Sequence, residues 1–355
     1  MVGPDGHLPL PWLAALLQEG LARNAHALLL HGPEGVGQFE LALTLAQAKL
    51  CEAPQSDPAL RKPCGTCAAC RLVQAHSHPD LLVLVPDALR ESLGWSAGVD
   101  PEDGAADKPG KAKPSREIKV EAVRTAVAFA QTTASRGKGK AVVLHPAERI
   151  NAIASNTLLK TLEEPPGDAR FVLSCARPEA LLPTIRSRCQ ALRLGLPPVT
   201  LATDWLAARG VAQPEILLAA CGGQPLHALQ WSGEGIDAEV WMRLPALVLR
   251  GEVAVFQAWP LPRLVDALQK LCHDALCIAA GAAPRYFPQG AVKTTAEAPA
   301  LTVWAQRLSR MALQAEHPWS AGLAVETLID EARRTLGEAP RPRPAGRPTR
   351  YTSAP

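Results

Sequence analysis

The sequence has no run of about 18 consecutive apolar residues. Its first residues, MVGPDGHLPLPWL, also lack the basic stretch, apolar core and small-residue cleavage site of a secretory leader. These absences exclude a membrane-spanning chain and predict a cytoplasmic protein with no membrane partner. The formal net charge is only +3 over 355 residues. That charge does not by itself indicate nucleic-acid binding, although the stretch PRPRPAGRPTR near the end is locally basic.

A second absence concerns the stretch HGPEGVGQFE, which follows a short apolar run and comes close to a phosphate-binding loop. That loop requires Gly, four residues, Gly, Lys and then Ser or Thr, because backbone N–H groups cradle phosphate, the lysine neutralises it and the hydroxyl binds Mg²⁺. Gly32 and Gly37 have the spacing, with Gly35 between them, but Gln38 and Phe39 replace the cation and the hydroxyl. The stretch is consistent with an ordinary turn between strand and helix, or with a degenerate nucleotide site that attracts anions weakly.

The carboxylates that ATP hydrolysis needs are also missing, at a second position in the sequence. An ATPase with a phosphate-binding loop usually ends a later strand with an acidic pair, which holds Mg²⁺ and polarises the attacking water. After the apolar run AVVL this chain has His145 and Pro146, and neither can do that chemistry. Glu148, the nearest carboxylate, is expected to belong to the following loop or helix. Loss of the lysine, the hydroxyl and the carboxylates together indicates a chain that has abandoned hydrolysis.

Short apolar runs alternate with helical stretches in the first half of the chain. They lie at residues 27–31, 80–86, 141–145, 171–175 and 191–194. This alternation predicts a parallel, doubly wound sheet. The stretch GVDPEDGAADKPGKAKPS cannot bury enough apolar surface to order itself and predicts a mobile insertion over residues 90–116.

After about Pro197 the strands stop and Ala/Leu-rich helical periodicity takes over. We therefore expect an α/β domain, a small helical domain, a larger all-helical domain and a proline-rich tail that is disordered. The expected ranges are 1–196 (with a cysteine module at 51–70 and the insertion at 90–116), 197–234, 235–337 and 338–355.

Nine cysteines, an odd number in a chain without a leader, argue against a disulfide framework. Four of them, spaced C-x₁₂-C-x₂-C-x₂-C, match the tetrahedral preference of Zn²⁺; they are Cys51, Cys64, Cys67 and Cys70. Thiol exchange is the alternative, but it uses two cysteines and leaves the other two unexplained. Because four thiolates saturate the metal, the predicted site is structural. The remaining five cysteines are expected to be small core residues; they are Cys175, Cys189, Cys221, Cys272 and Cys277.

Several stretches occur in a characteristic order: HGPEGVGQ, the cysteine cluster, SHPDLLVLVPD, SNTLLKTLEEPP and IRSRC. Together they resemble the delta-prime subunits of bacterial DNA polymerase III clamp loaders, a branch of the AAA+ proteins, over residues 10–195. The remainder is similar in helical architecture only. The resemblance implies an AAA+ P-loop-type domain with a parallel five-stranded sheet and a zinc-binding insertion, then a small helical lid and an all-α C-terminal collar domain for oligomerisation.

Within IRSRC, the residues Ser187, Arg188 and Cys189 match the family motif whose arginine reaches the ATP site of a neighbouring subunit. The resemblance therefore implies that Arg188 is an arginine finger acting in trans. Its permanently charged fork suits γ-phosphate oxygens, and such fingers contribute on the order of 10³ to 10⁵ in turnover. Arg186 has similar chemistry, but the family pattern favours Arg188; a solvated surface arginine is the alternative.

Other positions depart from the active members of the family. Lys160, Glu163 and Glu164 are expected to pair with one another on a solvated helix face, without a catalytic role. Active members carry a threonine after the fourth strand and an arginine in the lid, where this chain has Cys175 followed by Ala, and Leu226. Both nucleotide sensors are thus missing, which favours delta-prime over the gamma/tau motor subunits.

The resemblance implies a non-hydrolysing subunit of the DNA-directed DNA polymerase III holoenzyme. Such a subunit supports ATP-dependent loading of the sliding clamp on primed DNA, carries structural zinc, binds no ATP productively and assembles as a hetero-oligomer with gamma/tau and delta subunits. Two alternatives stay open. One is a catalytically active gamma/tau-like AAA+ ATPase in which Gln38 and His145 suffice. The other is a zinc-stabilised nucleic-acid-binding module outside the replisome, which the near-neutral composition disfavours.

Overall fold

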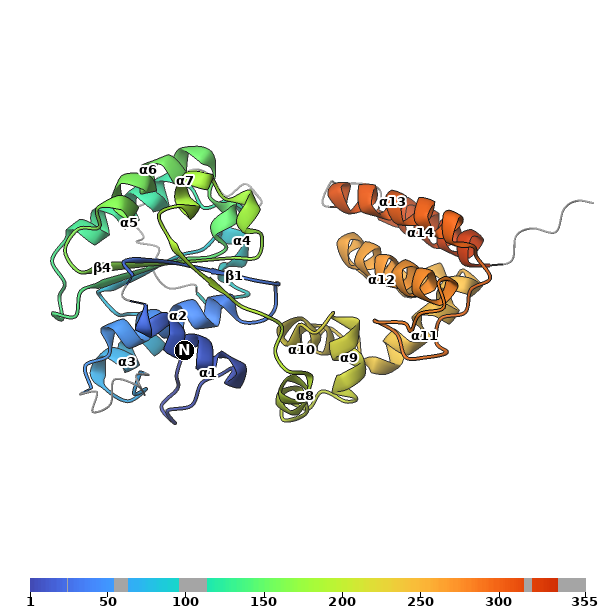
Figure 1. Ribbon diagram of the computed structural model, residues 1–355, viewed down its shortest axis with the longest axis horizontal. Helices are drawn as coiled ribbons and strands as arrows, with labels where there is room; N and C mark the ends of the chain where they lie inside the picture. Colours follow the sequence, from blue (N-terminus) through green and yellow to red (C-terminus); the bar gives the residue numbers. More distant parts are fainter. Residues whose placement is uncertain (24, 54–62, 96–113, 316–320, 338–355) are drawn as a thin grey trace, which may run out of the picture. The chain divides into compact units, whose positions relative to one another are not determined.

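The computed structural model describes residues 1–23, 25–53, 63–95, 114–315 and 321–337 (Figure 1). Most of the expected insertion, the whole expected tail and residues 54–62 of the cysteine module lie outside these ranges. The chain forms two compact units, Met1–Ala208 with Gly223–His227, and Arg209–Gly222 with Ala228–Pro355. The finer division into an α/β domain, a lid and a collar stays a prediction.

A parallel five-stranded sheet lies at the centre of the first unit, with strand order β2-β3-β4-β1-β5. The strands are β1 (Ala27–His31), β2 (Leu81–Leu84), β3 (Lys140–Leu144), β4 (Ala169–Cys175) and β5 (Gln190–Arg193). Each corresponds to one of the five apolar runs, so the predicted parallel sheet is confirmed. Every residue of β3 is buried, because helices cover both faces of the sheet.

Helices cover the two faces of the sheet in two layers. In Figure 1, α5, α6 and α7 lie on one face and α1, α2 and α3 on the other, and α2 packs directly against β3 and β4. The helical elements of this unit are η1 (Pro11–Leu13), α1 (Ala14–Ala22), α2 (Gln38–Leu50), α3 (Ala68–Gln74), α4 (Asp87–Arg90), α5 (Val120–Gln131), η4 (Ala147–Arg149), α6 (Ala152–Glu163), η5 (Pro178–Ala180), α7 (Pro183–Arg186) and α8 (Val199–Ala207).

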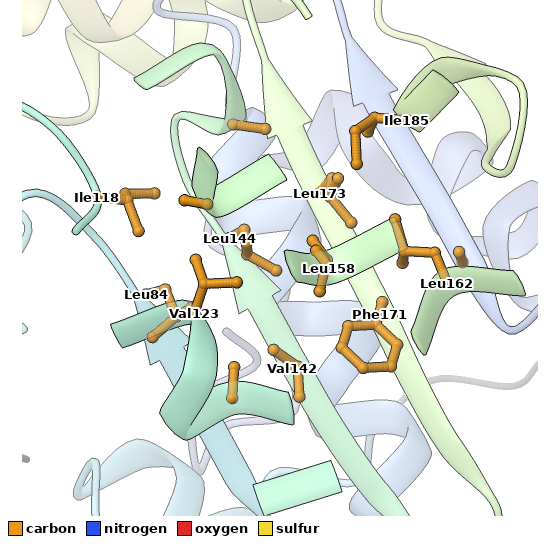
Figure 2. Close-up of a cluster of buried hydrophobic side chains, with 14 of the residues drawn as sticks. Leu84, Ile118, Val123, Val142, Leu144, Leu158, Leu162, Phe171, Leu173 and Ile185 are labelled. Atoms are coloured by element: carbon orange, nitrogen blue, oxygen red, sulfur yellow. The ribbon is translucent and has the colours of Figure 1, made fainter. Parts of the chain in front are cut away.

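The main apolar core lies between the sheet and the layer of α5, α6 and α7. Figure 2 shows strand side chains directed toward helix side chains across this core. The strands contribute Leu84, Val142, Leu144, Phe171 and Leu173, and the helical side contributes Val123, Leu158, Leu162 and Ile185. Leu158, Leu162 and Ile185 are at most 1% exposed. The ends of α6 and α7 are therefore fixed relative to the strands.

The described part of the second unit is helical and contains no strand, as the periodicity predicts. Its helices are α9 (Pro214–Ala220), α10 (Pro225–Gly233, whose first turn belongs to the first unit), α11 (Ala238–Arg250), η6 (Val253–Phe256), α12 (Leu261–Ala279), α13 (Ala298–Gln314) and α14 (Ala321–Leu336). Helix α12 packs against α13 and α14. Asp274 of α12 is fully buried and accepts the backbone N–H groups of Arg285, Tyr286 and Phe287, which fixes the segment after the helix.

A second buried carboxylate, Asp80, lies immediately before β2. Its oxygens accept the backbone N–H groups of Ser135 at 2.8 Å and Arg136 at 2.9 Å, and Lys140 Nζ lies 3.5 Å away. Burial opposes ionisation, but the hydrogen bonds and the nearby ammonium outweigh it, so the pKa of Asp80 is lowered from 3.8. The ionised carboxylate thus joins β2 to the turn that precedes β3.

We expect Asp80→Asn to lower the free energy of unfolding by about 1–3 kcal/mol at pH 7, because an amide cannot accept both N–H groups. The folded-state pKa is depressed, so the contribution of the carboxylate is complete above pH 3.8 and is lost as the pH falls through the folded-state value. Urea unfolding of the native protein and of Asp80→Asn at pH 7 and near pH 3 measures the difference between their free energies of unfolding. This difference should be smaller at the lower pH. The same difference at both pH values would contradict the expected loss of the Asp80 contribution in acid.

Candidate functional site

Three loops meet at one edge of the sheet. Strands β1, β3 and β4 are parallel and adjacent in the order β3-β4-β1, so their carboxyl ends lie together. This arrangement places Gly32 after β1, His145 after β3 and Cys175 at the end of β4 near one another. In open α/β sheets this edge is where ligands bind.

The loop between β1 and α2 requires glycine at two positions, because a side chain there would strain the backbone or overlap neighbouring atoms. Gly37 has φ of 104° and caps the N-terminus of α2, in a left-handed conformation that favours glycine. A Cβ on Gly37 would overlap the side chain of Leu10, and a Cβ on Gly32 would overlap the backbone oxygen of Leu194. Packing within the chain therefore accounts for these glycines without a bound phosphate.

Neighbouring segments also bind the carbonyl groups of this loop. The indole Nε1 of Trp12 donates to Val36 O at 2.8 Å, and the backbone N–H of Leu226 donates to Gly35 O at 3.1 Å. Leu226 is the position where the family's active members carry the lid arginine. Here a backbone hydrogen bond fixes the loop, and no cation is presented from that position.

Gln38 directs its side chain back into the loop. It is buried, and its Nε2 donates to Gly32 O at 2.8 Å and also to Pro33 O. The lysine of a phosphate-binding loop reaches the phosphates from this position. In this chain both amide protons are directed to carbonyl groups of the loop itself.

Aromatic rings lie where a nucleotide site would carry the hydroxyl and the carboxylates. The rings of Phe39 and His145 are 4.8 Å apart between centroids and inclined by 30°. Trp95 packs edge-on against Phe39 at 6.4 Å and stacks on His76 at 3.8 Å. These contacts are not predicted from the sequence. Trp95 lies inside the stretch expected to be a mobile insertion, but its side chain is buried and packed, so the expectation is wrong at this residue.

His145 is held neutral at pH 7. Burial lowers its pKa to about 4, and its Nδ1 lies 2.9 Å from the Ser174 hydroxyl. Glu148 lies in η4, the segment after β3, as expected, and its Oε1 accepts the backbone N–H groups of Ala176 and Arg177. This carboxylate therefore shapes the turn after β4.

The four predicted metal-binding cysteines lie in one cluster. All four Sγ atoms are within 4.8 Å of one another; Cys51 and Cys67 are 3.9 Å apart, as are Cys64 and Cys70. Tetrahedral Zn–S bonds of about 2.3 Å require sulfur separations of about 3.8 Å. The donor set and its spacing fit a tetrathiolate metal site, and no protein position is left open for a substrate.

Backbone N–H groups are directed at three of these sulfurs, and Cys51 Sγ accepts from the N–H of Cys64 at 3.5 Å. Cys64 Sγ accepts from the N–H groups of Thr66 and Cys67 at 3.4 and 3.2 Å, and Cys67 Sγ accepts from the N–H of Cys70. Burial opposes thiolate formation at Cys64, but these hydrogen bonds outweigh it and lower its pKa to about 6. The hydrogen bonds thus favour the thiolate at Cys64, whereas burial raises the pKa of Cys51 and Cys70.

Hydrogen bonds and an ion pair join the cysteine cluster to the sheet. Cys51 ends α2 and Cys67 caps the N-terminus of α3, and Glu52 pairs with Arg136 at 2.7 Å. Arg136 is also one of the two residues whose N–H binds Asp80. The cluster therefore holds the ends of two helices and a turn of the sheet.

The remaining five cysteines form no disulfide. Cys175, Cys221 and Cys272 are buried, as expected of core residues, whereas Cys189 and Cys277 are partly exposed. Burial raises the pKa of Cys175 to about 12, so this residue cannot replace a nucleotide sensor by ionising.

The predicted finger lies in a different layer of the unit from the glycine loop. Ser187 ends α7, Arg188 follows it, and Cys189 precedes β5. The chain is helical through Arg186, so Arg186 and Arg188 project in different directions. Arg188 is 29% exposed and forms an ion pair with Glu163 of α6. Among the described residues, Glu163 thus pairs with Arg188 and not with Lys160 as expected.

Comparison with known proteins agrees with these features. A family model described as DNA polymerase III, delta subunit, matches residues 12–197. DNA polymerase III subunit delta' of Pseudomonas aeruginosa is 37% identical over 270 residues, covering 72% of this chain and 74% of that protein. The chain belongs to the delta' family of DNA polymerase III subunits.

Other relatives of this delta' family member are also subunits of DNA polymerase III. The Escherichia coli (strain K12) subunit delta' is 30% identical over 283 residues, covering 73% of this chain and 76% of that protein. Subunit tau of the same organism is 30% identical over 174 residues, but these cover only 22% of tau. The predicted family is confirmed, and so is the predicted parallel five-stranded sheet followed by helices. No described helix has the length and apolar character needed to span a bilayer.

We expect the purified chain to contain about one zinc ion, by elemental analysis of protein prepared without chelator. Cys67→Ser should remove the ion and lower the melting temperature, because Cys67 is both a ligand and the cap of α3. Cys277→Ser is the matched control, since Cys277 lies with His273 and Asp274 in the other group of potential ligands. Less than about half an equivalent in the native protein, or loss of zinc only from the control, would contradict the four-cysteine site.

Proposed function

We propose that this chain is a non-hydrolysing delta' subunit that gives Arg188 to the ATP site of a neighbouring clamp-loader subunit. In this role it supports ATP-dependent loading of a sliding clamp on primed DNA, in a hetero-oligomer with gamma/tau and delta subunits. Zinc in the four-cysteine cluster is structural. The cytoplasmic location stays a prediction.

The contacts of the glycine loop are the observation that carries this proposal. Gln38 donates its amide protons to Gly32 O and Pro33 O, and Phe39 packs against the neutral ring of His145. Phosphoryl transfer needs a cation at the phosphates and a metal held by hydroxyl and carboxylate groups. The groups at these three positions supply neither.

The position of Arg188 supports the second part of the proposal. Its guanidinium is partly exposed and follows a short helix whose Ile185 is anchored in the main core. A rigid, partly exposed and permanently charged fork is suited to bind phosphate oxygens of another subunit. Ser187 and Cys189 flank it without a chemical role of their own.

We expect Arg188→Ala to lower the DNA- and clamp-stimulated ATP turnover of a reconstituted loader by at least tenfold, because a positive charge at the transition state is lost. Arg186→Ala, which removes an exposed arginine two residues away, is the matched control and should leave the rate unchanged. Size-exclusion chromatography checks that both variants still assemble. An unchanged rate with Arg188→Ala would place the finger elsewhere.

We also expect the isolated chain neither to hydrolyse ATP nor to be stabilised by it. A ligand that binds the folded state at 100 times its Kd would add about 2.7 kcal/mol to the free energy of unfolding. Thermal unfolding with and without millimolar Mg²⁺–ATP should therefore give the same melting temperature. Turnover by the chain alone would instead support a gamma/tau-like ATPase.

A further inference from the structure

Arg188 donates to three acceptors of its own chain. Its Nε donates to Glu163 Oε1 at 2.6 Å, and its Nη2 donates to the same oxygen. On the other side of the fork, Nη1 donates to the Thr184 carbonyl at 2.9 Å. A weaker contact of 3.5 Å joins Nη1 to the Ser187 hydroxyl.

Because the guanidinium of Arg188 is planar, each of its N–H protons can be assigned to an acceptor. It carries five N–H groups in a fixed fork. One oxygen that receives both Nε and Nη2 must lie along the side of the fork, so it uses the Nη2 proton on that side. The Thr184 carbonyl uses one Nη1 proton. The second Nη1 proton has only the weak contact with the Ser187 hydroxyl at 3.5 Å, and one Nη2 proton is left. A bidentate contact with phosphate requires two protons on neighbouring nitrogens, so a phosphate that binds in this way replaces only the contact with Ser187.

The residues that hold Arg188 are themselves fixed. Glu163 is the last residue of α6, and Thr184 lies in α7. Leu162, next to Glu163, and Ile185, next to Thr184, are both buried in the main core. The carboxylate and the carbonyl are therefore presented from a packed layer, while Glu163 and Arg188 stay 46% and 29% exposed and accessible to a second subunit.

We propose that Glu163 is a positioning residue for Arg188. Resting on the proposed function, this assigns Glu163 to the side of the guanidinium that carries Nε and one Nη2 proton. The other Nη2 proton and the Nη1 proton that only weakly contacts Ser187 are then left for phosphate. The carboxylate fixes the orientation of the finger before the neighbouring ATP arrives, and the phosphate does not have to select one rotamer among many.

This role differs from one in which Glu163 restrains the finger. A restraining carboxylate would have to be displaced by phosphate, so its removal would raise turnover in the absence of DNA and clamp. A positioning carboxylate stays bound along the side of the fork while phosphate binds at the end. Its removal would lower the stimulated turnover number and leave the KM for ATP nearly unchanged.

The test is a double-mutant cycle in the reconstituted loader, with ATP turnover measured as kcat and KM. We expect Glu163→Ala to lower the stimulated kcat about two- to fivefold, the range for an exposed ion pair. Glu163→Gln retains a neutral acceptor, so its stimulated kcat should lie between those of the native protein and Glu163→Ala. In the Arg188→Ala background, Glu163→Ala should have no further effect, since a residue that acts only through Arg188 has nothing left to position.

Glu164→Ala is the matched control, because it removes an exposed carboxylate one residue away. A rise in unstimulated turnover with Glu163→Ala would overturn the positioning role in favour of restraint. An equal loss with and without Arg188 would overturn it in favour of a structural role of the end of α6. If Arg188→Ala lowers the rate but Glu163→Ala does not, only the positioning role fails. If Arg188→Ala itself has no effect, the proposed function fails as well.

Discussion

The carboxyl edge of β1, β3 and β4 is the constraint on which the first unit depends. Three parallel strands end there, and the polar backbone and side-chain groups that follow them need partners. In this chain the partners are internal: Gln38 binds the carbonyls of its own loop, and Phe39 packs on His145. Glu148 binds the N–H groups after β4. Contacts within the chain therefore hold the shape of this edge.

The same sheet carries two chemically different regions on its two helical layers. The glycine loop leads into α2 on one face, whereas Arg188 follows α7, which lies with α5 and α6 on the other (Figure 1). The core between the sheet and the second layer fixes the ends of α6 and α7 (Figure 2). An edge without the lysine of a phosphate-binding loop and an arginine held by Glu163 thus coexist in one unit. The cysteine cluster strengthens the first layer, because it holds the ends of α2 and α3 and is tied through Glu52 and Arg136 to the turn before β3.

Much of this arrangement is predictable from sequence, since it follows from periodicity and spacing. The apolar runs mark all five strands to within two residues at either end, and the cysteine spacing predicts a cluster that the geometry forms. The sequence also shows directly that position 38 is not a lysine and that position 145 is not a carboxylate. The contacts that join distant segments are not predictable in this way. Trp95 packs on His76, although the polar stretch that follows Trp95 in the sequence does not suggest a buried side chain. Glu163 pairs with Arg188, which is 25 residues away, because tertiary packing places the ends of α6 and α7 together and overrides the helical spacing that suggested Lys160.

The contact between Phe39 and His145 also limits how these two positions can change. The two residues lie on different elements, α2 and the segment after β3, and each ring forms part of the packing surface of the other. A small hydroxyl residue in place of Phe39 would leave a cavity against a neutral imidazole, and a carboxylate in place of His145 would place a charge against an apolar ring. Either replacement alone is unfavourable, so the two positions are expected to vary together. A hydroxyl residue at position 39 and a carboxylate at position 145 would therefore have to be introduced together, because neither single substitution is neutral for the packing.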